Sequence, residues 1–329
     1  MKNRILVVGS FVEDLIVKTK KAPKSGESVI GDAFSRADGG KGANQAVQIA
    51  RLGGDVKMVG KVGSDVFAES LITTCRDSGI DVSEVIHSKG NSGISIVILE
   101  GNDEEGYQNR IIMTPGANYE LTVEDVRFLE QEIQNFDYLV LQYEIPQEVN
   151  VFLAKTAYFK GVKVICNPAP YRNASDEFLS YVTYFIPNET EFKGATGYEI
   201  DTQKEIDING IATASKPLLE KGIKNVIVTL GSRGSCLVNE DGCKFFPSVK
   251  NVKAVDPTAA GDSFIGALAT YLGKGLAIDD AILFANAVGS FTVQRLGAMP
   301  SLCTDKEFND YLKEIKDENY RGLPRLLKE

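Results

Sequence analysis

The sequence lacks the features that mark nucleic-acid-binding, membrane and metal-cluster proteins. Acidic residues outnumber basic ones by 45 to 36, for a formal net charge of -9, so the surface lacks the positive field that nucleic acids and anionic membranes require. No apolar run approaches the roughly 20 residues of a membrane span. The five cysteines include no C-x-x-C pair of the kind found in zinc or redox sites. We therefore expect a cytoplasmic protein with reduced cysteines that binds neither nucleic acid nor membrane.

The sequence also lacks two common nucleotide-binding patterns and a good candidate for a catalytic histidine. The first apolar segment ends in Gly9-Ser-Phe-Val and not in the three-glycine fingerprint of dinucleotide-binding folds, which argues against a dehydrogenase. The glycine-rich segment at 38–46 has no Ser or Thr directly after its lysine, so it is not a Walker motif. The single histidine, His87, lies in a polar stretch, and we expect it at the surface and not in an active site.

What the sequence does contain is an ordinary globular composition and a regular alternation of strands and helices. Hydrophobic residues make up 43% and charged residues 25%, as in typical soluble proteins. The alternation implies right-handed crossovers, and therefore an α/β fold with a mostly parallel central sheet flanked by helices on both faces. The expected strands cover residues 4–9, 56–60, 138–142, 162–166, 184–187 and 226–230. The expected helices cover residues 43–52, 67–78, 123–134, 147–159, 206–221, 260–272, 278–293 and 304–316.

Two pairs of extended segments interrupt this alternation and predict a small β-strand lid. Residues 15–17 and 28–36 form one pair; residues 93–100 and 107–114, joined by an acidic turn that contains glycine, read as a hairpin. We expect residues 1–329 to form one α/β domain with lid strands near 15–36 and 93–114. The apolar face of such a lid must be shielded from water, which favours a homodimer in which the lids of two copies form the interface. The charged end after residue 317 is expected to be loosely ordered.

Three polar segments have the residue types that phosphate chemistry needs. Residues 38–46 (DGGKGANQA) place glycines before a helix, where the backbone can approach a ligand closely. Residues 254–264 (AVDPTAAGDSF) open an apolar helix with small residues, so free N–H groups and the helix dipole can hold a phosphoryl group, and Asp262 can accept the proton of an attacking hydroxyl. Residues 187–191 (PNETE) offer oxygens suited to the water shell of Mg²⁺. Each segment also has a structural explanation: a tight turn, a favourable first-turn acid, and an N-capped helix start.

Five blocks together resemble the ribokinase family of carbohydrate kinases in their order and spacing. They are GGKGANQA, NPAP at 167–170, PNETE, TLGSRG at 229–234 and DPTAAGDSF, and the similarity extends from about residue 5 to residue 301. The resemblance implies a ribokinase-like α/β fold with a β lid that forms the dimer interface. It also implies a kinase that uses ATP, Mg²⁺ and K⁺ to phosphorylate a primary hydroxyl of a small sugar. The AAGD form and the GGKGAN block are similar to the ribokinase branch, which implies the 5-hydroxyl of D-ribose as acceptor.

The resemblance also implies roles for individual residues. Asp262 would be the catalytic base, and the N–H groups of Ala259, Ala260 and Gly261 would form the anion hole. The sugar would be bound by Asp14, Gly40, Lys41, Asn44, Glu144 and Asp262. The nucleotide would be bound by Asn188, Thr229, Gly231 and Asn286, with Glu191 at the Mg²⁺ end. The monovalent cation would be held by loops that contain Asp256, Thr258, Thr292, Arg295, Gly297 and Ser301.

One position departs from the family pattern. Ribokinases usually have Asn two residues before the aspartate that corresponds to Asp14, and this chain has Val12. The lost amide removes a hydrogen-bonding group near the sugar, unless the Glu13 carboxylate replaces it. A kinase for 2-deoxy-D-ribose, another small sugar or a nucleoside is therefore an alternative. A catalytically silent sugar-binding protein is an alternative from another class, although the intact Asp262 and anion-hole segment argue against it.

Overall fold

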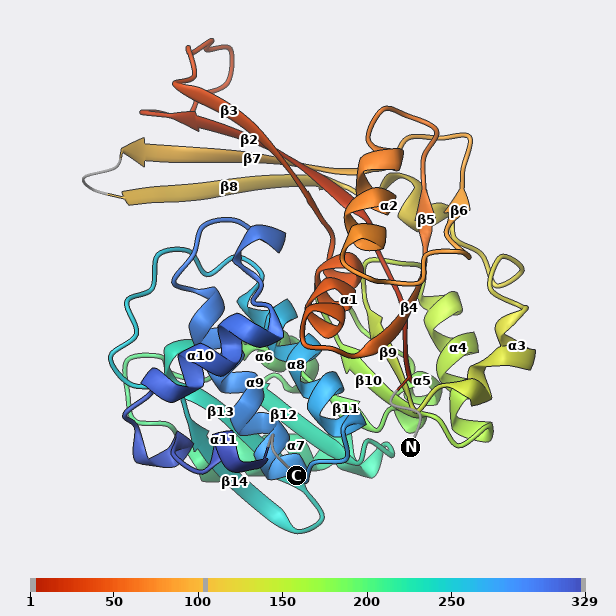
Figure 1. Cartoon of the computed structure of the whole chain (residues 1–329), viewed down its shortest axis with the longest axis vertical. Helices are drawn as coiled ribbons and strands as arrows, with labels where there is room; N and C mark the ends of the chain where they lie inside the picture. Colours follow the sequence, from red (N-terminus) through yellow and green to blue (C-terminus); the bar gives the residue numbers. More distant parts are fainter. Residues whose placement is uncertain (1–3, 103–105, 327–329) are drawn as a thin grey trace.

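The computed structural model describes residues 4–102 and 106–326, and its centre is an eight-stranded sheet (Figure 1). The spatial order is β14-β13-β12-β11-β10-β9-β1-β4. From β12 through β11, β10, β9 and β1 to β4, each strand pairs in parallel with its neighbour. The hairpin of β13 and β14 at the other end of the sheet is antiparallel, and β13 also pairs antiparallel with β12. This confirms the predicted α/β class and adds an edge hairpin that was not predicted. The strand bounds are Arg4–Val8 (β1), Asp55–Val59 (β4), Tyr138–Gln142 (β9), Lys163–Asn167 (β10), Tyr184–Phe185 (β11), Asn225–Thr229 (β12), Gly234–Asn239 (β13) and Gly242–Pro247 (β14).

Helices cover both faces of the sheet, and each face has its own hydrophobic core. Within β1, Ile5 and Val7 point into one core while Leu6 and Val8 point into the other, as expected for a strand that is buried on both sides. One face is covered by α1 (Lys41–Arg51), α2 (Ala68–Asp77), α8 (Ala260–Gly273), α9 (Ile278–Thr292), α10 (Asp305–Glu314) and α11 (Leu323–Leu326). The other is covered by α3 (Leu129–Glu132), α4 (Gln147–Phe159), α5 (Asp176–Ser180), α6 (Glu189–Thr196) and α7 (Ile208–Glu220).

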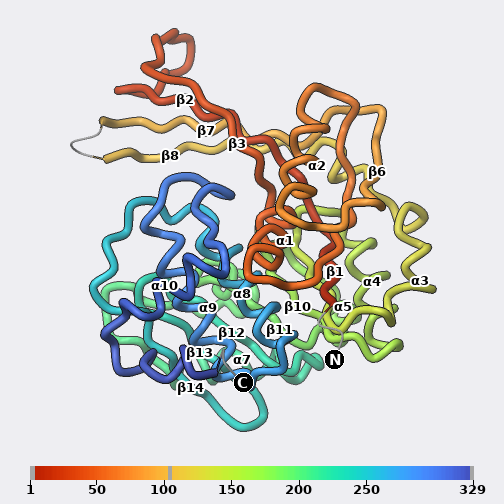
Figure 2. The backbone as a smooth tube through the Cα atoms, in the orientation of Figure 1, coloured from red at the N-terminus to blue at the C-terminus, as the bar shows by residue number. Residues whose placement is uncertain are grey.

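A second sheet forms an arm that extends beyond the helices (Figure 2). Its order is β3-β2-β7-β8, and we call it the lid sheet. Its strands match the four extended segments predicted from the sequence, except that residues 28–32 precede the strand; residues 103–105 of the predicted acidic turn lie outside the described residues. The strands are Val12–Thr19 (β2), Ala33–Gly39 (β3), Gly93–Asn102 (β7) and Gly106–Thr114 (β8). A two-stranded sheet of Lys61–Val62 (β5) and Ile86–His87 (β6) lies nearby, with His87 exposed as expected.

Two local predictions are wrong. The helix expected at 123–134 is a series of turns with only α3 and a short 3-10 helix, Ile133–Asn135, because Asp125 accepts hydrogen bonds from Thr122 N and Lys61 Nζ that fix a turn. The end of the chain is not loose over residues 318–326, where Tyr320 and Leu323 are buried. Residues 327–329 of that expected tail lie outside the described part. Of the helices between residues 4 and 326, none combines the length and apolarity that crossing a bilayer requires.

Candidate active site

Two adjoining cavities open where the parallel strands end. The larger has a volume of about 950 Å³ and the smaller about 200 Å³. Both are lined by Asn188, Thr229, Pro257 and Gly261, so these residues mark the junction. Thr229 ends β12 and Asn188 follows β11, which places the junction at the carboxyl edge of the sheet. Ligands of open α/β sheets bind at this edge, so the two cavities can hold two ligands in contact.

The start of α8 forms one wall of the junction. Ala259 precedes the helix with φ 60, a left-handed conformation that costs a non-glycine residue about 1 kcal/mol or more. Gly261 lines both cavities, and a Cβ added there would meet no protein atom within 4 Å, so it would project into open space. The Ala260 N–H donates to Pro257 O at 3.2 Å. Of the three N–H groups expected in the anion hole, that of Ala260 is therefore engaged within the protein.

Asp262, also in the first turn of α8, is buried and held by two amides. Asn44 Nδ2 lies 2.9 Å from its Oδ2, and Gln45 Nε2 lies 2.9 Å from its Oδ1. Both amides come from the N-terminal part of α1, within the glycine-rich segment 38–46. Because both groups donate, the carboxylate acts as an acceptor on both oxygens. The Asn44 Oδ1 atom is buried with no partner among the described residues, so it is available to a ligand hydroxyl.

The remaining residues predicted to bind the sugar surround this carboxylate. Glu144 Oε2 accepts hydrogen bonds from Ser10 Oγ at 2.5 Å and from Lys41 N at 3.1 Å. Burial raises the pKa of Asp14 to about 6, and the Ser95 hydroxyl opposes the shift. Burial alone lowers the pKa of Lys41, but the surrounding carboxylates outweigh it, so the pKa lies above its ordinary value and the ammonium stays charged. A cation thus lies among acidic groups beside the smaller cavity.

Gly40 and Val12 pack against each other next to this region. Gly40 has φ 97, and an added Cβ would lie 2.8 Å from Ser10 O and from Val12 N, so only glycine fits. Val12 is buried and lies on the same face of β2 as Asp14, two residues on. Glu13 lies on the opposite face, where its Oε1 is 2.5 Å from Arg36 Nε. The hypothesis that the Glu13 carboxylate replaces the missing amide does not fit this arrangement.

The residues predicted at the nucleotide end line the cavities. Asn188 caps α6: its Oδ1 accepts from Glu191 N, and Glu191 Oε2 accepts from Asn188 N, both at 2.9 Å. The structural explanation of this segment is therefore correct, and Asn188 and Glu191 line the smaller cavity as well. Burial raises the pKa of Glu191, although the Asn188 N–H opposes the shift. Thr229, Gly231 and Asn286 line the larger cavity.

The two loops expected to hold a monovalent cation are joined by Asp256. Its Oδ1 accepts hydrogen bonds from Thr258 N at 2.9 Å and Oγ1 at 2.6 Å, and its Oδ2 accepts from Gly297 N at 2.8 Å. The Arg295 guanidinium forms an ion pair with Glu307 at 2.9 Å. Because a guanidinium is positively charged and has no acceptor atom, only the main-chain oxygen of Arg295 is suited to a cation. The side chains of Thr292 and Ser301 are buried and donate to main-chain carbonyls in this region.

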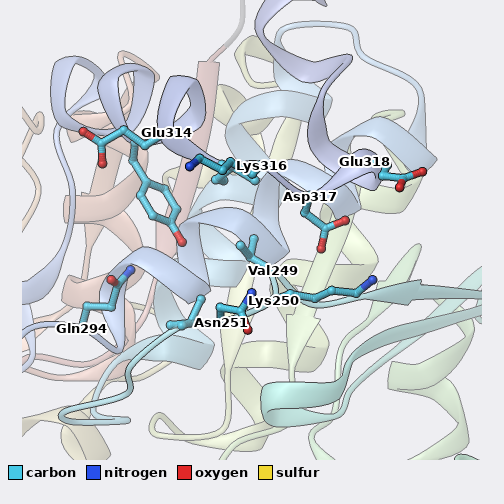
Figure 3. A pocket seen from close by; sticks show the side chains of 11 residues that line it. Val249, Lys250, Asn251, Gln294, Glu314, Lys316, Asp317 and Glu318 are labelled. Atoms are coloured by element: carbon cyan, nitrogen blue, oxygen red, sulfur yellow. The ribbon is translucent and has the colours of Figure 1, made fainter.

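A further cavity of about 450 Å³ lies on the other side of residues 249–252 (Figure 3). These four residues line both this cavity and the larger one, and so form the partition between them. The segment after α10 closes the far side. Its Tyr320 hydroxyl donates to Pro247 O at 2.6 Å. The C-terminal segment therefore supports the loop that lines the larger cavity.

Some residues in the site were not predicted from the sequence. Ser10 donates to Glu144, and Gln45 donates to Asp262. The only sequence signals for a role in the site were that Ser10 directly follows the first strand and that Gln45 is adjacent to Asn44, and both signals are weak. Ser95 faces Asp14 because β2 and β7 pair in parallel. The pairing of Asp14 with Ser95 depends on how β2 and β7 align in the lid sheet, and the sequence alone does not give this alignment.

Comparison with known proteins identifies one family. The profile described as "pfkB family carbohydrate kinase" matches residues 2–305. A ribokinase of Schizosaccharomyces pombe is 39% identical over 317 residues, covering 93% of this chain and 98% of that relative. A deoxyribokinase of Salmonella typhi is 34% identical over 310 residues, covering 94% of this chain and 98% of that relative.

Solved structures support the same assignment. Ribokinase from Thermotoga maritima has a TM-score of 0.83 and 36% identity, covering 94% of this chain and 99% of that one. Arabidopsis thaliana ribokinase, complexed with ribose and ATP, has a TM-score of 0.86 and 30% identity, covering 95% and 99%. Fold and relatives define a phosphotransferase with an alcohol group as acceptor. The chain belongs to the PfkB family of carbohydrate kinases.

Proposed function

We propose that this kinase transfers the γ-phosphate of ATP to the 5-hydroxyl of D-ribose. The observation that carries the proposal is the position of Asp262, a buried carboxylate in the first turn of α8, at the smaller cavity and beside Gly261. Relatives named ribokinase from several organisms, and the Arabidopsis ribokinase with ribose and ATP, support ribose as the acceptor. We propose that residues 1–329 act as one domain with a lid.

In the proposed reaction, the sugar lies between Asp14, the Gly40–Asn44 turn and Glu144, and ATP lies along the larger cavity near Asn188, Thr229, Gly231 and Asn286. Asp262 accepts the proton of the 5-hydroxyl as its oxygen forms a bond to the γ-phosphorus. The bond from that phosphorus to the β,γ-bridging oxygen breaks, and ADP leaves with the electron pair. The Gly261 and Ala259 N–H groups and the Lys41 ammonium stabilise the charge on the phosphoryl oxygens.

We propose that Asn188 and Glu191 orient Mg²⁺ with its water shell. The Glu191 carboxylate fits this role because burial penalises its own charge, and a nearby cation relieves that penalty. When bound, Mg²⁺ would neutralise phosphate charge.

We also propose that the Asp256 and 292–301 loops hold K⁺, whose charge would help fix the first turn of α8. We expect higher kcat in potassium buffer than in tetramethylammonium buffer at equal ionic strength and saturating Mg²⁺, because the larger organic cation cannot enter a ring of protein oxygens. Equal rates in the two buffers would contradict the cation site, and a sodium series provides the control for size selectivity.

A second candidate acceptor is 2-deoxy-D-ribose, and Val12 is the observation that favours it. A buried sugar hydroxyl that faces valine methyls lacks a partner, which costs on the order of 1–3 kcal/mol. A deoxy sugar avoids this cost. A deoxyribokinase of Salmonella typhi, 34% identical to this chain, is consistent with this acceptor.

Val12→Asn is expected to shift the ratio of kcat/KM for D-ribose over 2-deoxy-D-ribose toward ribose. Each 1.4 kcal/mol of regained hydrogen bonding changes the ratio by about tenfold. Steady-state kinetics with both sugars measures it, with Val12→Leu as the apolar control. A wild-type preference for ribose above roughly 100-fold that Val12→Asn leaves unchanged shows that this position does not read the sugar.

We propose that two copies associate through the lid sheet. Its exposed side chains include Phe34, Ile111 and Ile112, which are 64%, 57% and 63% exposed. Apolar side chains gathered on a sheet with free edges favour association with a second copy.

An ADP-release assay over D-ribose, 2-deoxy-D-ribose, fructose, 2-keto-3-deoxygluconate and adenosine tests the proposed function. We expect the highest kcat/KM with D-ribose or its deoxy analogue. A clear preference for another acceptor would overturn the pentose assignment. Sugar binding without turnover on any of the five would support the catalytically silent alternative.

A further inference from the structure

Gln45 contacts Asp262 directly but has no part in the chemistry described above. It is the fifth residue of α1, and its side chain is completely buried. Its amide nitrogen is 2.9 Å from Asp262 Oδ1 and 3.3 Å from Asn167 Oδ1. Its amide oxygen accepts a hydrogen bond from Gln142 Nε2 at 2.7 Å. Both ends of the Gln45 amide are therefore occupied.

The contacts with Asp262 and Gln142 require the same orientation of the Gln45 amide. An amide is a donor at its nitrogen and an acceptor at its oxygen, and the two ends have nearly the same shape. Because Gln142 donates to the Gln45 oxygen, the Gln45 nitrogen is turned toward the carboxylate. Gln142 is the last residue of β9 and is also fully buried. The central sheet thus supplies a hydrogen-bond partner for the acceptor end of an amide on α1.

We propose that Gln45, oriented by Gln142, is a positioning residue for the catalytic base. This inference rests on the proposed role of Asp262. Gln45 and Asn44 each donate to a different oxygen of the carboxylate, which fixes its plane. Donors to a carboxylate also favour its ionised form, which is the form that accepts a proton. Removal of Gln45 takes away one of these two donors and leaves the carboxylate freer to rotate.

Other charged groups also face Asp262. The Lys41 ammonium attracts the carboxylate charge, whereas the carboxylates of Asp14 and Glu191 repel it. These groups come from α1, β2 and α6. None of them is altered by a change at Gln45, so a loss of kcat in such a variant reports the lost amide donor.

The test compares Gln45→Met with Gln48→Met. Methionine has a similar length and volume but donates no hydrogen bond. Gln48 lies on the same helix, is equally buried, and donates to Cys303 O at 3.0 Å, so its replacement imposes the same structural cost away from Asp262. We expect Gln45→Met to lower kcat by roughly 10- to 100-fold, with KM for ATP little changed. Gln48→Met is expected to lower Tm and leave kcat near the wild-type value.

Gln142→Met provides a second readout if Gln45→Met does not fold. It removes the donor to the Gln45 oxygen and is expected to lower kcat less, again with KM for ATP little changed. If folded Gln45→Met or Gln142→Met keeps the wild-type kcat, the positioning role is overturned. Asp262→Asn separates this failure from that of the proposed function. If Asp262→Asn lowers kcat steeply while Gln45→Met has the wild-type kcat, only the positioning role is refuted. If Asp262→Asn lowers kcat only mildly, the assignment of Asp262 as the base is refuted.

Discussion

Asp262→Asn should lower kcat by roughly 10²–10⁴-fold, because asparagine keeps the shape of the side chain but cannot accept the proton of the hydroxyl. Binding of sugar and ATP should be largely kept. Asn44 and Gln45 each donate to one oxygen of the Asp262 carboxylate. In Asp262→Asn one of these oxygens is replaced by an NH₂ group, which is a donor and cannot accept the hydrogen bond. We expect this mismatch to cost about 1 kcal/mol of stability, which a thermal melt measures.

The matched control for this change is Asp125→Asn, since Asp125 accepts hydrogen bonds from Lys61 and Thr122 far from both cavities. It should lower Tm and leave kcat near the wild-type value. If Asp262→Asn lowers kcat by less than about tenfold while the KM values rise steeply, Asp262 binds ligand and does not take the proton.

Gly261→Ala should lower kcat by roughly 10²-fold, comparable to the loss of one donor from an oxyanion hole. A Cβ at this position meets no protein atom within 4 Å, but Gly261 lines both cavities, so the methyl group enters the space between the two substrates. The change should not lower Tm, because Ala is favoured over Gly inside a helix by up to about 1 kcal/mol. Loss of activity without loss of stability is thus the expected signature.

Gly322→Ala is the control for this change, because its added Cβ also meets nothing within 4 Å and the position precedes α11, outside both cavities. It should leave kcat unchanged. If Gly261→Ala keeps the wild-type kcat, the phosphoryl group does not pass close to this residue, and the anion hole must be formed by other residues.

The central sheet could be predicted because its strands are buried on both faces. Apolar runs such as residues 138–141 can be recognised as strands without knowledge of their neighbours. The edge hairpin β13 with β14 was missed because its strands contain glycine, lysine and cysteine, and their pattern is weak. The helix expected at 123–134 failed for a different reason: the ion pair of Asp125 with Lys61 joins residues distant in sequence.

Much of the candidate site could also be predicted, since its residues lie in compact blocks at element boundaries. Asn44 and Asp262 come from separate blocks, and the structure brings them within a hydrogen bond of each other. The contacts that sequence reasoning did not find depend on register and side-chain direction. Ser95 reaches Asp14 only through the parallel pairing of β2 with β7, and Glu13 points away from the sugar because neighbouring residues on a strand face opposite sides.

Identification of the product tests the central claim most directly. The protein is incubated with ATP, Mg²⁺ and D-ribose, with 2-deoxy-D-ribose in parallel, and the sugar phosphate is examined by ³¹P and ¹³C NMR. The account predicts one ADP for each sugar phosphate, a phosphorus coupled to C5, and formation of that product roughly 10²–10⁴-fold more slowly with Asp262→Asn. Phosphate attached at C1, or ATP hydrolysed to ADP and free phosphate with both sugars unchanged, would contradict it.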